Sequence, residues 1–403
     1  MENINRIPNW IKQNKIIILV ILCALLGNYI SFQKIGFRIG NDATRFLSGA
    51  ESLLNSETLE VREFNYIGYI LLVSVNKIFD WNASGIYFFQ ISFHVLACVL
   101  LFLIGRNISS YKTGLIVSLG WGFLIFHTYW NFYIMSDSLF ISLLIMIIFL
   151  FQRLKYKRSI DILCFLTAVI YLGIFRPNGF YLAVIFLLGS LFIIQSWLLR
   201  FGIITCIMLF MGISPTSPTG IVFWSGESQG SFIKDLIWGQ LIDGTIIWKK
   251  VLIDMPHPEN QSPNNIISGY AKYVLNFPIE TIGLYLQRIF HFLFNWNPYY
   301  SMMRNVVNFC FLAGFHSIFL IGLLYAKKKD PFFCTIAIAI LFHLCFVALT
   351  HVDYDGRFLA YILPLQVVFV MKGLQSIAHF ASKFEPSVTA WLDRTKTKQP
   401  RLP

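Results

Sequence analysis

Charged residues are scarce in this chain of 403 residues, where they make up only 13% of the sequence. A soluble globular domain carries about 25% charged residues, so this composition argues against a soluble protein. The apolar content is correspondingly large, with 56% hydrophobic residues and 40 phenylalanines. The composition therefore predicts a protein that lies mostly within a lipid bilayer.

Familiar catalytic and metal-binding motifs are also lacking. The chain has no GxxxxGK[ST] or HExxH motif, so nucleotide hydrolysis and zinc proteolysis have no support. All seven cysteines fall in apolar segments and none forms a CxxC pair. The cysteines therefore predict neither a metal cluster nor a disulfide framework.

Long apolar runs predict an all-α fold, a polytopic transmembrane bundle of about ten helices. Several runs are shorter than the ~20 residues that span a typical hydrocarbon core, which makes their ends approximate. The expected helices are 16–32, 85–105, 113–130, 135–151, 160–175, 179–198, 201–214, 304–326, 331–349 and 358–376.

The basic residues are distributed unevenly across the two sides that these helices create. One side holds 19 Lys/Arg and 5 Asp/Glu and the other 13 and 15, which together make the 32 and 20 of the whole chain. Excess Lys and Arg mark the cytoplasmic face, so both termini are predicted to be cytoplasmic. The net charge of +12 then reflects topology. Clusters such as Lys155–Arg158 and Lys327–Lys329 are interpreted as lipid-headgroup contacts, and no nucleic-acid partner is expected.

The first outward loop, 33–84, is too polar to be buried in lipid. Its apolar residues recur at helical spacing, at Phe46, Leu47, Ala50, Leu53 and Leu54. This pattern predicts an amphipathic helix along the membrane surface. A second apolar run, Tyr66 to Phe79, is too short to span and is predicted to be a second interfacial helix.

A larger outward loop covers 215–303 and carries Trp224, Trp238, Trp248 and Trp296 among polar residues. Tryptophan at this density suits headgroup anchoring or stacking on sugar rings, and anchoring is favoured. The membrane domain is expected to cover 1–379, followed by a basic cytoplasmic tail at 380–403.

Four groups of polar residues are predicted to meet on the outward side. They are Asp42, Ser136-Asp137, Arg176-Pro177-Asn178-Gly179 and Asp353-Tyr354-Asp355-Gly356-Arg357. A guanidinium held at headgroup level suits a phosphate, because it is planar and always charged. The simpler alternative is that each arginine extends to the interface as any long basic side chain does.

In these motifs the sequence resembles the GT-C superfamily of integral-membrane glycosyltransferases, which includes protein O-mannosyltransferases and the aminoarabinose transferase acting on lipid A. The resemblance covers roughly 16–376 and depends on the order of short motifs. These motifs are Gly40-Asn41-Asp42-Ala43-Thr44-Arg45-Phe46, Asn65-Tyr66-Ile67-Gly68-Tyr69, Ser136-Asp137-Ser138-Leu139, Phe175-Arg176-Pro177-Asn178-Gly179 and Gly356-Arg357-Phe358-Leu359.

The resemblance implies an inverting transfer of a sugar from a polyprenyl-phosphate donor to an acceptor hydroxyl on a glycan, lipid or protein. It implies Asp42 as the general base, and Arg176 and Arg357 as the groups that receive the lipid phosphate. Asp137 is expected to orient a sugar hydroxyl or an arginine. Arg45, Tyr66 and Tyr69 complete the expected substrate-binding set.

One departure from the family concerns a metal. Many relatives have two adjacent acids in the first loop, whereas here Ala43 follows Asp42. No cofactor is therefore predicted. The Asp353-x-Asp355 spacing near His351 leaves room for a divalent cation, although pairing with arginine is the favoured interpretation.

Two other functions compete with a transferase. A flippase for a lipid-linked glycan would explain a basic, aromatic cavity, but ionisable groups within the expected helices are scarce. A glycan polymerase or ligase would share the outward arginines and leave Asp42 replaceable. For the enzyme, the expected location is the bacterial inner membrane, with the site on the extracytoplasmic face.

Overall fold

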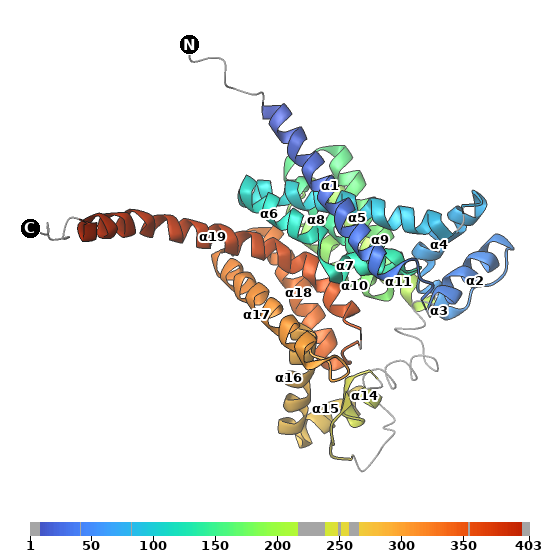
Figure 1. Cartoon of the computed structure of the whole chain (residues 1–403). Helices are drawn as coiled ribbons and strands as arrows, with labels where there is room; N and C mark the ends of the chain where they lie inside the picture. The colour runs from blue at the N-terminus through green and yellow to red at the C-terminus, as the bar shows by residue number, and fades with distance from the viewer. Residues whose placement is uncertain are drawn as a thin grey trace, which may run out of the picture.

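The chain is an all-α helical bundle in the computed structural model, which describes residues 9–40, 42–81, 83–216, 238–248, 251–257, 266–353 and 355–396 (Figure 1). Within these residues, six helices are long and apolar enough to cross a bilayer, which indicates a membrane protein. They are α1 (Asn9–Ile35), α5 (Ala83–Ile108), α8 (Ser136–Arg153), α17 (Met302–Tyr325), α18 (Pro331–Leu349) and α19 (Arg357–Lys396).

Two of the other expected membrane helices, α9 (Ser159–Phe175) and α10 (Pro177–Ser190), are shorter than these six, and a third, α11 (Trp197–Thr216), has 20 residues. The helices α9 and α10 replace 160–175 and 179–198, whereas α11 extends beyond 201–214. Arg176 has extended backbone angles and separates α9 from α10. A residue before proline disfavours the helical region, so Pro177 explains this break.

The expected helix at 113–130 is wrong in its extent. Helix α6 (Tyr111–Gly122) ends early and is followed by the short α7 (Ile125–Thr128) and the 3-10 helix η1 (Tyr129–Phe132). Helix α6 approaches α1 so closely that a Cβ on Gly27 would lie 1.9 Å from the carbonyl oxygen of Gly122. Glycine permits this contact but is a poor helix former. The chain leaves the helix there and turns back toward α8.

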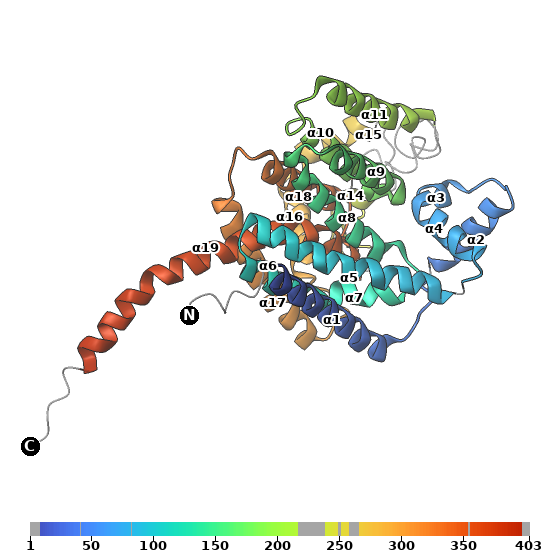
Figure 2. The same cartoon turned by 90° about the horizontal axis from the view of Figure 1, so that it is seen from above.

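Both amphipathic helices of the first loop are present. They are α2 (Ala43–Leu54) and α4 (Ile67–Ile78), joined through α3 (Val61–Phe64). Phe46 and Ala50 of α2 are buried, and the Phe46 ring lies 4.8 Å from that of Tyr69 in α4. The three helices form a group at one side of the bundle (Figure 2).

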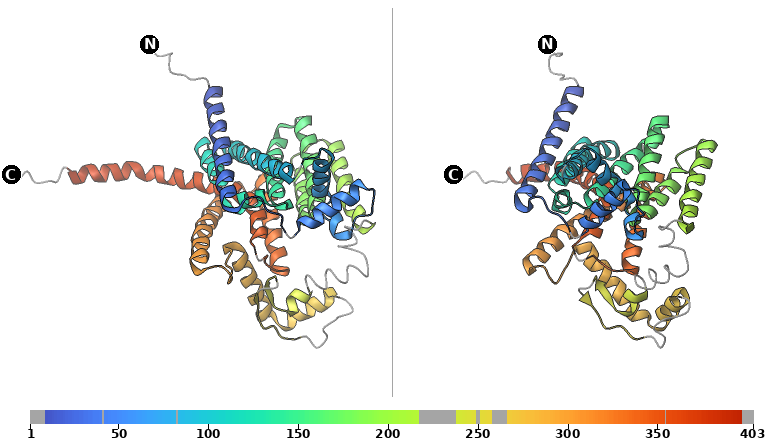
Figure 3. Two further views of the ribbon diagram at one scale, coloured as in Figure 1. Left: turned by 45° about the vertical axis from the view of Figure 1, so that its right-hand side comes forward. Right: turned by 90° about the vertical axis from the view of Figure 1, so that its right-hand side faces the viewer.

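The second large loop folds into a small lobe beneath the bundle in Figure 1. It contains α14 (Gln240–Ile242), the antiparallel strands β1 (Thr245–Ile247) and β2 (Val251–Leu252), α15 (Ile266–Asn276) and α16 (Pro278–Phe294). Trp238 is buried in this lobe and Trp224 lies outside the described residues. The tail expected from 380 begins inside α19, which continues without a break to Lys396 and projects from the bundle (Figure 3).

The lobe is held together by Arg288 of α16, whose side chain is closed to solvent. Its guanidinium donates to the carbonyl oxygens of Thr245 at 2.8 Å, Gln240 at 2.7 Å and Ala348 at 2.8 Å. Ala348 lies at the end of α18, where the carbonyl groups carry the negative end of the helix dipole. One side chain therefore joins the strand β1, helix α14 and the end of a long membrane helix.

We expect Arg288→Lys to destabilise the protein by about 2–4 kcal/mol, because an ammonium group cannot reach three carbonyl groups in a planar fork. The measurement is thermal unfolding of the purified protein in detergent. Arg158→Lys is the matched control, because Arg158 is exposed. Equal stability of the two variants would contradict the role given to Arg288.

Candidate functional site

The site is framed by a short backbone contact between two segments that are far apart in the sequence. The amide of Arg38 donates to the carbonyl oxygen of Phe132 at 2.8 Å, and the amide of Ile134 donates to that of Arg38 at 3.3 Å. Both segments then lead directly to an acid, Asp42 before α2 and Asp137 in the first turn of α8. The contact therefore brings these two carboxylates to the same end of the bundle.

A buried amide from α5 supports this frame. The Gln90 side chain donates to the carbonyl oxygens of Asn131 at 2.9 Å and Tyr133 at 2.8 Å. Its own oxygen accepts from the Tyr69 hydroxyl at 3.2 Å. Tyr69 has no exposed surface, so the structure places this expected substrate-binding residue in the scaffold beneath the site.

The second element of the site is an ion pair that is almost closed to solvent. Arg176 donates from Nη1 to Asp137 Oδ1 at 2.7 Å, and the Tyr361 hydroxyl donates to the same oxygen. The side chains of Arg176 and Asp137 are only 7% and 2% exposed. Burial opposes the charge on Arg176, but the Asp137 carboxylate holds the pKa of Arg176 above its usual value. This guanidinium is therefore permanently charged.

Aromatic rings surround the Arg176 guanidinium, whose Cζ lies 4.7 Å from the centre of the Tyr361 ring and 5.6 Å from that of Tyr66. Its Nε is buried and has no hydrogen-bond partner among the described residues. A buried donor without a partner is costly. The Arg176 Nε therefore marks a place where an acceptor from a ligand would be stabilised.

The third element is Arg357, the first residue of α19. Its Nε lies 2.9 Å from Asp353 Oδ2 and 3.0 Å from Asp355 Oδ2, and its Nη1 lies 3.2 Å from Asp42 Oδ2. Arg45 approaches Asp42 from the other side, at 3.4 Å. Nε and Nη1 of Arg357 thus make its hydrogen bonds to these three acids.

The acids around the arginines differ in how far they are exposed. The side chain of Asp42 is 34% exposed, whereas those of Asp355, Asp353 and Asp137 are 22%, 8% and 2% exposed. Asp137 also interacts electrostatically with Arg357, so it links the two guanidiniums. Asp42 is thus the acid most accessible to an incoming molecule, and the other three are committed mainly to holding the arginines.

The loop that carries Asp353 is fixed by the small lobe. The amide of Val352 donates to the carbonyl oxygen of Ile246 at 2.8 Å, and that of Trp248 donates to Val352 at 3.0 Å. Gly356 has φ +78° and packs against the Asn295 side chain, in a conformation that glycine adopts easily. The lobe therefore sets the position of Arg357.

The possible cation site at Asp353 and Asp355 does not assemble from the described residues. No three His, Cys, Asp or Glu side chains among them are grouped as metal ligands. His351 instead lies against Trp248, with ring centres 4.7 Å apart. Burial and the neighbouring Asp353 carboxylate raise the pKa of Asp355 to about 8. Asp355 therefore keeps its proton at neutral pH and shares it with Asp353.

Most of the expected site residues meet, namely Asp42, Arg45, Asp137, Arg176, Arg357 and Tyr66, and Tyr69 is the exception. Sequence reasoning missed Tyr361 and Gln90. Tyr361 follows Arg357 by four residues, a spacing that places two side chains on one face of a helix, so its position could have been inferred. Nothing in the sequence around Gln90 indicates its role, because its partners are backbone carbonyl groups and the hydroxyl of the distant Tyr69.

We expect the raised pKa of Asp355 to make the protein less stable as the pH rises from about 5 to 8. In the unfolded chain an aspartate has lost its proton above pH ~4, whereas the folded protein keeps it until about pH 8. Folding therefore binds a proton in this window, and raising the pH opposes it. Asp355→Asn removes this contribution, so its melting temperature should fall less over the same pH range.

The measurement is the melting temperature of both proteins in detergent between pH 5 and 9. The buried His351, whose pKa burial lowers to about 4, acts in the opposite direction but is present in both proteins. Asp243→Asn, at an exposed acid, is the control. Parallel curves for wild type and Asp355→Asn would show that Asp355 is charged at neutral pH.

Comparison with known proteins does not assign this site. No protein-family model matches the chain, and no curated protein matches it significantly. The arrangement of Asp42, Asp137 and the two arginines is therefore the feature of this chain that indicates a function.

Proposed function

We propose that the protein is an inverting glycosyltransferase that moves a sugar from a polyprenyl-phosphate donor to an acceptor hydroxyl. The observation that carries the proposal is that two arginines able to bind a phosphate lie at the same end of the bundle as an accessible acid. Arg176 has a buried donor without a partner among the described residues, and both Arg176 and Arg357 interact with Asp137. Beside them stands Asp42, the most exposed of the four acids.

The two arginines suit the leaving group of such a reaction. A polyprenyl phosphate leaves as a stable anion, so the enzyme must supply positive charge more than a proton. Guanidinium groups bind phosphate oxygens through two parallel hydrogen bonds. Asp137 keeps Arg176 charged and oriented, Asp353 does the same for Arg357, and Asp355 helps to orient Arg357.

Asp42 is suited to act on the acceptor. The acceptor oxygen attacks the anomeric carbon, its proton passes to the Asp42 carboxylate, and the bond from that carbon to the phosphate oxygen breaks. Because the attack comes from the side opposite the phosphate, the configuration at the carbon inverts. Asp42 lies directly before α2 and its side chain is 34% exposed, so a large acceptor can reach it.

The ion pair between Asp42 and Arg357 gives this chemistry an order. Without substrate, Arg357 Nη1 lies 3.2 Å from Asp42. A donor phosphate competes for the same guanidinium, and its binding draws Arg357 away from the carboxylate. Asp42 is then free to accept a proton only when the donor is in place.

The membrane setting supports the same proposal. The donor diffuses within the bilayer and presents its phosphate at the headgroup boundary. The amphipathic helix α2 directly follows Asp42 and packs against the amphipathic helix α4, so the two helices hold the acid at that depth. The smaller excess of Lys and Arg on this side of the predicted topology supports an extracytoplasmic site, and we propose the bacterial inner membrane as its location.

We expect Asp42→Asn to reduce sugar transfer by about 10²–10⁴-fold, because the variant cannot accept the acceptor's proton. Purified protein in nanodiscs would be given a panel of radiolabelled polyprenyl-phosphate sugars with a membrane lipid extract. Glu57→Gln removes an exposed acid in the same loop and should retain full activity. Donor movement across the bilayer without any sugar transfer would instead support a transporter.

Arg176→Lys should weaken donor binding about tenfold or more while the protein still folds. Lysine keeps the charge opposite Asp137, but it cannot form the fork that a phosphate needs. The loss of one charge-assisted hydrogen bond corresponds to a factor of this size. The measurement is the KM for the donor, with Arg158→Lys as the control. An unchanged KM would remove Arg176 from the donor site.

A further inference from the structure

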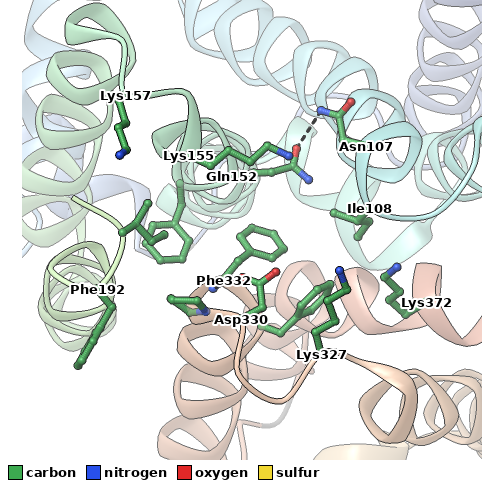
Figure 4. Close-up of a pocket in the computed structure, with 14 residues that line it drawn as sticks. Asn107, Ile108, Gln152, Lys155, Lys157, Phe192, Lys327, Asp330, Phe332 and Lys372 are labelled. Atoms are coloured by element: carbon green, nitrogen blue, oxygen red, sulfur yellow. Dashed lines mark hydrogen bonds between the residues drawn. The ribbon is translucent and has the colours of Figure 1, made fainter. Parts of the chain in front are cut away.

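A second polar site lies at the opposite end of the bundle. A cavity of about 490 Å³ opens there between α5, α8, α18 and α19, close to the end of α10 (Figure 4). Helix α8 carries Asp137 in its first turn and Gln152, which lines this cavity, near its other end. At about 1.5 Å per residue, these two side chains are separated by roughly 22 Å along the helix, a large part of the thickness of a hydrocarbon core.

The cavity is strongly basic. Lys155, Lys157, Lys327 and Lys372 line it, against the single acid Asp330. The Asp330 carboxylate accepts a hydrogen bond from the amide of Phe332 at 3.0 Å, where it caps the start of α18. Four lysines therefore share the lining with one counter-charge, and only Lys157 and Lys372 have side-chain acceptors among the described residues, at Gln195 and Gln375. An anion in the cavity would relieve the repulsion between the ammonium groups.

A buried amide adds a specific donor to this charge. Gln152 is 4% exposed, and its oxygen accepts from Asn107 at 3.1 Å. Its Nε2 is buried and has no hydrogen-bond partner among the described residues. In Figure 4 the amide stands at the rim formed by α8 and faces the cavity. A buried donor without a partner is costly, so an acceptor supplied by a ligand would stabilise this part of the fold.

The walls of the cavity favour a lipid over a small ion. Phe151, Phe332 and Phe333 contribute to the lining, together with Phe192, which is 77% exposed. An aromatic ring that exposed, at the end of an apolar helix, suits contact with acyl chains. A free phosphate would use the lysines and Gln152 but would gain nothing from these rings.

We propose that this cavity binds the phosphate group of an anionic membrane lipid, with the acyl chains lying along the exposed ring of Phe192. The lysines supply charge, and Gln152 Nε2 donates to a phosphate oxygen. Basic pockets between membrane helices on the cytoplasmic side bind anionic headgroups in this way. The site uses no residue of the proposed transferase site.

The test measures how lipid raises the melting temperature of the full-length protein in detergent. Phosphatidylglycerol should raise it, and phosphatidylcholine should raise it far less. Lys327→Gln/Lys372→Gln should need about tenfold or more phosphatidylglycerol for half the effect, because each basic residue near a lipid headgroup contributes substantially to binding. Each variant is compared with its own melting temperature without added lipid, which separates binding from stability.

Two further variants sharpen the result. Lys328→Gln/Lys329→Gln removes two exposed charges that do not line the cavity and should behave as wild type. Gln152→Leu keeps the side chain's size but removes the donor, and should weaken the phosphatidylglycerol effect several-fold. Equal losses in the two lysine pairs would overturn the proposal in favour of diffuse surface charge. Stabilisation by inorganic phosphate alone, or equally by phosphatidylcholine, would overturn it as well.

Discussion

The need to neutralise buried charge governs the end of the bundle where the candidate site lies. Asp137 and Arg176 lie almost entirely out of solvent, and each is tolerable only because the other is present. Their pair joins α8 to the junction of α9 and α10, and Tyr361 adds α19. Arg357 forms ion pairs with Asp42 of the first loop and with Asp353 of the segment between α18 and α19. The positions of five chain segments thus depend on a few charge contacts.

Much of the fold follows from patterns that the sequence displays directly. The apolar runs and the helical spacing of Phe46 and Ala50 predicted the long helices and α2, because burial of apolar surface is the main force behind both. The early end of α6 was not predicted, although Gly120 and Gly122 in its last turn are poor helix formers. The close approach of Gly122 to Gly27 in another helix could not be inferred, because that contact exists only after the chain has folded. The strands Thr245–Ile247 and Val251–Leu252 of the small lobe are too short for their sequence to show the alternation of apolar and polar residues that predicts a strand.

The site was predictable where charge and topology decide it. Asp42, Asp137, Arg176 and Arg357 meet because acids and arginines at the same ends of successive helices attract one another. Tyr69 shows the limit of that reasoning. Its motif placed it beside Tyr66, but one helical turn separates the two side chains, and Tyr69 turns into the core toward Gln90. Exposure of a single aromatic residue depends on packing that the sequence pattern does not specify.

The contact between Arg38 and Ile134 is made entirely by peptide groups, and this has an evolutionary consequence. The Arg38 side chain is exposed, so homologous chains are free to exchange it while the frame is kept, whereas the buried Ile134 must remain apolar. Proline is the exception at either position, because Arg38 and Ile134 each contribute an amide hydrogen that proline lacks. Gly40 is restricted for a different reason, since a Cβ there would lie 3.0 Å from the sulfur of Met135. Distant homologues would therefore share the backbone geometry that brings Asp42 near Asp137 even after the sequence around these residues had diverged.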